Sequence, residues 1–144
     1  MTVSSYSAIN LIVTFAGVAF TGFADGDDVV TVDRNNASMT QRVGIQGDAV
    51  YSQTADKSGK ITIKLLQNSE TNSLLTAKIQ ASEAGAIVSA PLIVTETGSD
   101  AKVTAMKCVI EGQPTFTRGA NANTVEWVFL SADISIAHGT GETL

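Results

Sequence analysis

The sequence predicts a mainly β protein: an antiparallel β-sandwich or barrel with one flanking α-helix. Two observations support this fold class. Most segments with an apolar pattern alternate with the period of two that is typical of strands, and only the segment at about 70–83 has helical spacing. Turn residues rather than helices separate the strand-like segments, and such connections favour antiparallel pairing.

The composition fits one domain that spans residues 1–144. A chain of 144 residues can enclose a hydrophobic core. Its 44% apolar and 16% charged residues are typical of a folded protein. The mean hydropathy is positive, so we expect partners to cover much of the surface. The net charge of −5 and the scattered basic residues argue against a module that grips nucleic-acid phosphates.

The apolar segment at 9–23 is neither a signal peptide nor a membrane span. The first basic residue, Arg34, follows this segment, so a positively charged n-region is missing. The segment is also too short, and too interrupted by polar residues and glycines, to cross a bilayer as a helix. We therefore expect a cytosolic product that does not insert into a membrane.

The first part of the chain predicts strands and a turn. Residues 9–15 alternate as a strand, and 18–23 resume it after Gly17 as a bent or hairpin-paired strand. Asp25 and Gly26 have the composition of a tight hairpin turn, so 29–33 is expected to be the returning strand.

Residues 34–50 are polar and contain glycines, with little sustained alternation. They predict a long loop or extended hairpin that reaches away from the core. Long ordered loops in compact domains usually have a function.

The rest of the chain predicts further strands and one helix. Gly59 is expected to take a positive φ in the turn between the first two of these strands. The expected strands are 50–56, 60–67, 91–97, 102–112 and 124–136.

The helix at about 70–83 has clear end signals. Asn68 or Ser69 can cap it, Glu70 suits its first turn and Gly85 can end it. A narrow apolar stripe, expected to pack on the sheet or at an interface, consists of Leu74, Leu75 and Ile79.

No catalytic, cofactor or metal site is predicted, so we expect no enzyme activity. The lone His138 begins a tail at 138–144 that we expect to be flexible, where it would be a poor base. The carboxylates at 25–28 are flanked by strands rather than by the helices of an EF-hand, which favours an exposed turn. Cys108 is expected to be a buried thiol, and Trp127 a core or interface anchor.

Four segments resemble, in order, the tail tube proteins of contractile-tailed (myovirus-type) bacteriophages. The most specific is "DKSGKITIKLLQNSETNSLL" (56–75), with its turn, glycine, alternating strand, "LLQ", polar helix cap and Asn-x-Leu. Residues 13–35 resemble the family's first hairpin, and 41–59 resemble its long loop returning to the next strand. Residues 123–139 resemble its closing strand, which contains a tryptophan.

The resemblance implies a structural virion protein that is assembled in the host bacterial cytoplasm. Six copies would form a ring, and stacked rings would form a tube inside a contractile sheath. The implied partners are other copies of this chain, the tail sheath protein, the tape measure protein, and the baseplate and tail terminator proteins. Genomic DNA would pass through the lumen without specific binding, which an acidic wall favours.

The resemblance and the loop at 34–50 together suggest how rings stack. Stacking needs a segment that reaches along the tube axis, and this loop is the best candidate. Its charges are of mixed sign, as expected where one ring meets the next, and its glycines would keep it mobile in the free subunit. The predicted stacking residues are Arg34, Asn35, Asn36, Arg42, Gly44, Gly47 and Asp48.

Two other functions fit parts of the sequence. The same fold could form the tube of a phage-like contractile injection system, such as a tailocin or a type VI secretion system, and neighbouring genes would distinguish this from a virus. A small carbohydrate-binding β-sandwich would need a groove with exposed aromatic residues. The sequence has only eight aromatic residues, most of them on apolar faces.

Overall fold

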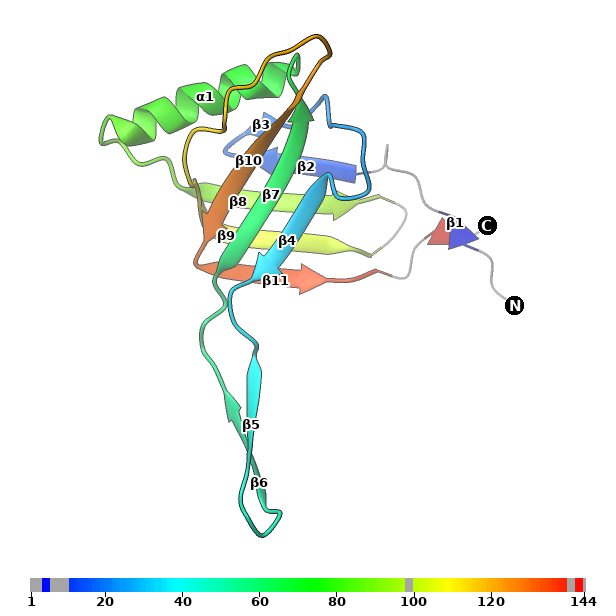
Figure 1. Ribbon diagram of the computed structural model, residues 1–144, viewed down its shortest axis with the longest axis vertical. Coiled ribbons are helices and arrows are strands. Elements are labelled where there is room, and N and C mark those ends of the chain that lie inside the picture. The colour runs from blue at the N-terminus through cyan, green and yellow to red at the C-terminus, as the bar shows by residue number, and fades with distance from the viewer. Residues whose placement is uncertain (1–3, 6–10, 98–99, 140–141, 144) are drawn as a thin grey trace.

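The computed structural model describes residues 4–5, 11–97, 100–139 and 142–143. These residues form two packed β-sheets with one helix across one end, and a long hairpin projects from the other end (Figure 1). The strands are β1 (Ser4–Ser5), β2 (Leu11–Phe15), β3 (Val18–Ala19), β4 (Val30–Arg34), β5 (Met39–Val43), β6 (Ala49–Gln53), β7 (Gly59–Leu66), β8 (Ala90–Glu96), β9 (Lys102–Ile110), β10 (Thr124–Ser131), β11 (Asp133–Ala137) and β12 (Glu142–Thr143), and the helix is α1 (Glu70–Glu83).

The main sheets are antiparallel throughout, which confirms the predicted fold class. We call β4, β7, β10 and the end of β9 the front sheet. The back sheet has the order β3, β2, β8, β9, β11. The front strands cross the back strands steeply (Figure 1), as in orthogonal sheet packing.

Strand β9 belongs to both sheets and forms a corner of the sandwich. Its first part pairs with β8 and β11, and Val109 and Ile110 pair with β10. Between these parts Lys107 has a φ of 50°, so the strand bends there. The Ser131 hydroxyl secures the corner because it donates to the Met106 carbonyl at 2.6 Å and accepts from the Asp133 N–H.

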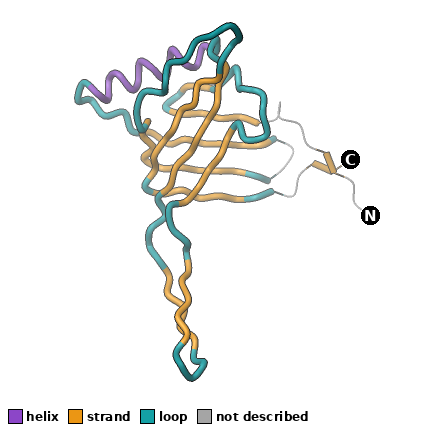
Figure 2. The backbone as a smooth tube through the Cα atoms, in the orientation of Figure 1, coloured by secondary structure: helices purple, strands orange, loops and turns teal. Residues whose placement is uncertain are grey.

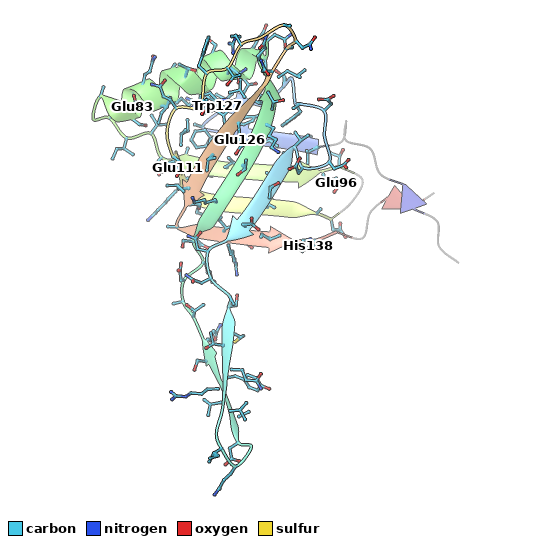
Figure 3. All side chains as sticks on the ribbon, viewed as in Figure 1. Glu83, Glu96, Glu111, Glu126, Trp127 and His138 are labelled. Carbon is cyan, nitrogen blue, oxygen red and sulfur yellow. The ribbon has the colours of Figure 1, made fainter. Side chains whose placement is uncertain are left out.

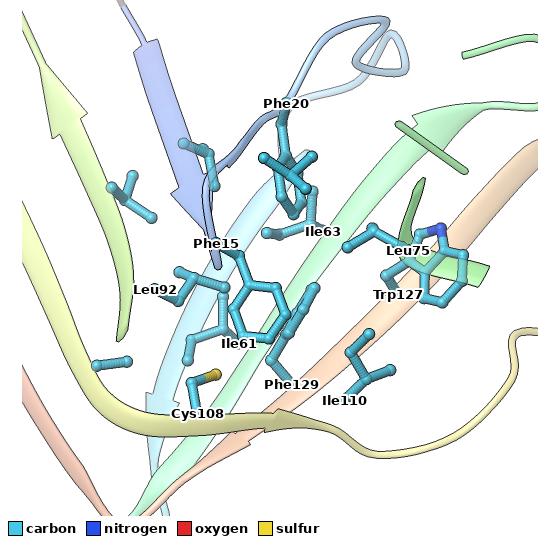
Figure 4. Packing of buried hydrophobic residues seen from close by; sticks show 14 of the residues in the cluster. Phe15, Phe20, Ile61, Ile63, Leu75, Leu92, Cys108, Ile110, Trp127 and Phe129 are labelled. Carbon is cyan, nitrogen blue, oxygen red and sulfur yellow. The ribbon is translucent and has the colours of Figure 1, made fainter. Parts of the chain in front are cut away.

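The hydrophobic core lies between the two sheets and under the helix (Figure 4). Phe15 of the back sheet meets Phe129 of the front sheet edge-on, with ring centroids 5.1 Å apart. Complete burial of one such side chain contributes roughly 1.5–3 kcal/mol. The largest fully buried apolar side chains are Trp127, Phe15, Phe129, Ile61, Ile63, Leu65, Leu75, Leu92 and Ile134.

Helix α1 has the bounds that the sequence predicts. The Ser69 hydroxyl caps it by accepting from the Thr71 N–H, and Gly85 follows its end with a φ of 106°. Leu75 and Ile79 are buried as predicted. Leu74 is 50% exposed, so it does not pack on the sheet, and its role at an interface stays a prediction.

The turn predicted at Asp25 and Gly26 is not a hairpin turn. Phe23 forms a bridge with Leu65 of β7, and β4 pairs with the same strand from Val30 onward. The intervening acidic residues therefore loop out from one edge of the front sheet. The hairpin that does form joins β2 to β3, where Ala16 and Gly17 both have positive φ, as a type I′ turn requires.

The expected role of Gly59 is also wrong. Its φ is not positive, and it is the first residue of β7. A Cβ atom there would collide with the carbonyl oxygen of Asp33 in the neighbouring strand and approach Ile134 Cδ1 to 2.8 Å. Glycine is therefore needed for close packing rather than for a turn.

Several predictions concern the chain ends. Residues 9 and 10 of the first predicted strand lie outside the described residues. So do 140, 141 and 144 of the predicted tail, whereas β12 within it pairs with β1. In the described part, α1 is too short and too polar to cross a membrane.

Candidate assembly surfaces

The described residues contain no group of three or more His, Cys, Asp or Glu side chains that could hold a metal ion. Cys108 is fully buried, as predicted, and burial raises the pKa of its thiol from 9.0 to about 12. A thiol with this pKa stays protonated and unreactive at neutral pH. Trp127 is a core anchor, since it is 1% exposed and its indole Nε1–H donates to Asn72 Oδ1 at 2.9 Å.

The loop predicted at 34–50 is part of an extended hairpin formed by β5 and β6, which runs to Gln53 (Figure 2). All residues of both strands are exposed. The tip is closed by hydrogen bonds from Gly44 N–H to Asp48 O at 2.7 Å and from Gly47 N–H to Gly44 O at 3.0 Å. Of the two predicted forms, a loop or an extended hairpin, the structure has the hairpin, and its strands are paired in the single subunit.

The predicted stacking residues fall into two groups. Arg34, Asn35 and Asn36 hold the base of the hairpin instead of extending along it. Arg34 donates from Nε and Nη2 to the Ile134 carbonyl at 3.0 and 2.6 Å. The Asn35 and Asn36 amides donate to Ser58 and Asp56 on the returning chain. Hydrogen bonds from Ser58 and Asn36 lower the pKa of Asp56. The Asp56 carboxylate therefore stays charged at neutral pH and keeps these hydrogen bonds at the base of the hairpin.

The second group, Arg42, Gly44, Gly47 and Asp48, lies at the far end of the hairpin. The two faces of the hairpin follow from the strand register: one carries Met39, Gln41, Val43, Ala49, Tyr51 and Gln53, and the other carries Thr40, Arg42, Val50 and Ser52. The first face holds most of the apolar side chains, and they are exposed in the described subunit, where Met39 is 56% and Tyr51 71% exposed. An exposed apolar surface of this kind marks an interaction site.

The front sheet carries charged side chains that lie beside one another, among them Glu126 (Figure 3). Lys64 is hydrogen-bonded to Asp28 at 2.9 Å and lies directly across from Glu126. The bond to Asp28 is the main reason why the pKa of Lys64 is raised, and it lowers the pKa of Asp28. Lys60 lies between Asp33, its partner in β4, and Glu111, whose carboxylate is 3.8 Å away.

Each of these two lysines therefore has a carboxylate on both sides. The sequence showed the alternation of Lys60 and Lys64, but it could not show which acidic residues lie beside them. These positions hold more carboxylates than lysines, and each lysine is paired with a carboxylate.

A groove opens between the sheets on the side where β8 and β11 end, with a volume of about 690 Å³. Apolar side chains from both sheets line it, including Phe23, Val30, Val32, Val103 and Ile136. These side chains are only partly buried, because the sheets are not closed together at this side. No pattern in the sequence predicted this groove.

Charged groups surround the mouth of the groove. Asp25, Asp27 and Glu96 are acidic and Lys102 is basic, and His138 also lines the groove. Glu96 and His138 lie on the same side of the sandwich (Figure 3). The exposed acidic turn at 25–28 and the lone histidine thus lie beside the same groove, although nothing in the sequence links them.

The model of the family described as "Bacteriophage PhiTE tail tube protein" matches residues 1–139. The chain belongs to this family. This confirms the resemblance to phage tail tube proteins and makes the chain a structural component of a phage tail rather than an enzyme. No curated protein matches the sequence of this tail tube protein.

Solved structures share the tail tube protein's fold at low sequence identity. The anti-feeding prophage tube-terminating cap is 10% identical with a TM-score of 0.65, covering 95% of this chain and 93% of that one. The sheath/tube terminator of an extracellular contractile injection system (PVC) is 11% identical, with a TM-score of 0.62 and coverages of 93% and 97%. The sheath-tube complex of that system matches at 11% identity and a TM-score of 0.61, with coverages of 92% and 91%. These likenesses show the fold alone.

Proposed function

We propose that the chain is the tube subunit of a contractile phage tail, assembling as hexameric rings that stack into the channel for genome delivery. Membership of the tail tube family carries this proposal. The exposed apolar face of the hairpin supports it, because the described subunit has no surface that covers this face.

In this proposal the outward face of the front sheet lines the channel. DNA carries one negative charge per phosphate, and proteins hold it mainly through lysine and arginine. Lys60 and Lys64 are both flanked by carboxylates, so a passing phosphate must compete with a carboxylate for each of these cations. A wall that is acidic overall, with its lysines paired to carboxylates, would let the genome slide through without binding.

The hairpin makes the ring-to-ring contact in this proposal. It projects from the end of the sandwich opposite to α1 (Figure 1), so it can reach a subunit beyond the ring that holds its own sandwich. The outer partners would be the tail sheath, baseplate and terminator proteins, and the tape measure protein would fill the channel before the genome.

Concentrating the purified protein tests the proposal. We expect light scattering to report large particles and negative-stain micrographs to show rings and tubes with an open centre. A protein that remains monomeric at millimolar concentration, with neither rings nor tubes in the micrographs, would overturn the proposal.

A tube of a phage-like injection system is the second candidate. The observation that favours it is the fold shared with components of two such systems. Particles isolated from the producing cell distinguish the two candidates, because a virus carries a DNA-filled head at the end of the tail and an injection system does not.

A further inference from the structure

The hairpin tip and the groove are two apolar surfaces that one copy of the chain cannot bring together. The hairpin leaves the sandwich where β4 ends and β7 begins, and it points away from the sandwich (Figure 1). The groove opens on the side where β8 and β11 end. Arg34, Asn35 and Asn36 fix the base of the hairpin, so the hairpin cannot fold back. A second copy is needed to join the two surfaces.

The groove is large enough to hold side chains of the hairpin tip, and both surfaces carry exposed apolar residues. Val43 and Ile45 are the aliphatic side chains nearest the tip, and they are 57% and 105% exposed. The groove of about 690 Å³ is within the range of roughly 300–1,000 Å³ that is typical of binding pockets. Most of the side chains that line it are apolar, with charged side chains among them, so aliphatic side chains can enter it and gain from burial.

Their charges also match. Beside the aliphatic side chains, the end of the hairpin carries Arg42 and Asp48. The mouth of the groove carries Asp25, Asp27 and Glu96 together with Lys102. The arginine can meet carboxylates, and the aspartate can meet the lysine, which fixes the orientation of the tip.

We propose that the groove between the sheets receives the hairpin tip of a second copy of this chain, with Val43 and Ile45 in the groove and Arg42 at its acidic mouth. This inference rests on the proposed function, in which the hairpin joins one ring to the next. The hairpin and the groove are different surfaces, so the contact is heterologous and repeats from copy to copy, as a stacked tube requires.

Cross-linking of two cysteine variants tests this contact. Ile45→Cys at the tip and Val30→Cys in the groove are purified separately, mixed under assembly conditions and treated with a short bismaleimide. We expect a covalent dimer in the mixture at a yield at least tenfold above that of either variant alone. Ile87→Cys replaces Val30→Cys in the matched control, because Ile87 is 74% exposed and lies outside the groove.

A charge reversal adds an independent readout. Arg42→Glu in the Ile45→Cys chain should lower the dimer yield several-fold, whereas Arg42→Lys should preserve most of it. Equal yields from the two variants would contradict the role given to the acidic mouth.

The outcomes separate this inference from the proposed function. Tubes without a link to Val30→Cys, or with equal links to Ile87→Cys, overturn the groove contact and leave the tube role standing. A specific link between chains that form no rings or tubes supports the groove contact and overturns the tube role. Absence of both the link and the tubes overturns both.

Discussion

Leu74 and Leu75 are neighbours in α1 but lie in different environments, which gives a matched pair of substitutions. Leu75 is fully buried and Leu74 is 50% exposed. Leu75→Asp would place an unpaired carboxylate in the core, so we expect it to lower the free energy of unfolding by about 4 kcal/mol or more.

Leu74→Asp is the control for this prediction. It adds the same charge to the same helix turn at an exposed site, and we expect a change within about 0.5 kcal/mol. Urea denaturation of both variants measures the difference. Equal loss of stability in the two variants would show that α1 does not pack through Leu75.

Cys108 predicts a pH dependence of stability. The pKa of its thiol is raised from 9.0 to about 12 in the fold, so the unfolded chain loses the proton at lower pH than the folded one. The contribution of Cys108 to stability is therefore complete below pH 9 and is lost as pH rises from about 9 toward 12.

Comparison with Cys108→Ala isolates this effect from other groups that titrate in alkali. The stability advantage of the wild-type chain over the variant should shrink by about 1.4 kcal/mol per pH unit in that range. Denaturation curves at pH 8 and pH 10 measure it, and a constant advantage at both pH values would contradict a buried thiol.

At the scale of elements, the hairpin is a module whose base and tip have different roles. Hydrogen bonds from Arg34 and Asn36 hold the base, while every residue of β5 and β6 is exposed in the described subunit. Replacing residues 39–53 by a short Gly-containing turn should therefore leave the melting temperature of the subunit almost unchanged. We expect this variant to form single rings but no long tubes in micrographs.

Val43→Ser with Ile45→Ser is the matched control for the shortened chain. It keeps the length and backbone of the hairpin and removes only apolar surface, so it should also shorten the tubes. Long tubes of normal diameter from the shortened chain would move the axial contact to another part of the subunit.

Local sequence patterns predicted where the helix and strands lie better than they predicted which strands pair with each other. The bounds of α1 followed from its capping residues, and most strands followed from their alternation. The single strand predicted at 124–136 is wrong, because it is divided between β10 and β11. Partners depend on contacts between distant residues, so the chain after Asp25 was assigned to a hairpin although it pairs with β7. Gly59 shows the same limit, because its close neighbour Asp33 is visible only in the fold.

At the scale of the whole molecule, the candidate surfaces arise from the way in which the sheets are joined. The bend at Lys107 closes one side of the sandwich and leaves the groove at the other. The front sheet brings Lys60 and Lys64 beside carboxylates from three other segments. No short stretch of sequence indicates either arrangement, so these surfaces could not be predicted. The tail tube role could be predicted, because the family resemblance lies in one continuous segment, 56–75.

The most direct test of the central claim is a cryo-electron microscopy reconstruction of tubes grown from the purified chain. We predict rings of six subunits in which the outward face of the front sheet, with Lys60, Lys64 and Glu126, faces the lumen, and in which β5 and β6 reach the next ring. A tube in which that face lies on the outside, or in which the hairpins touch only their own ring, would contradict the account.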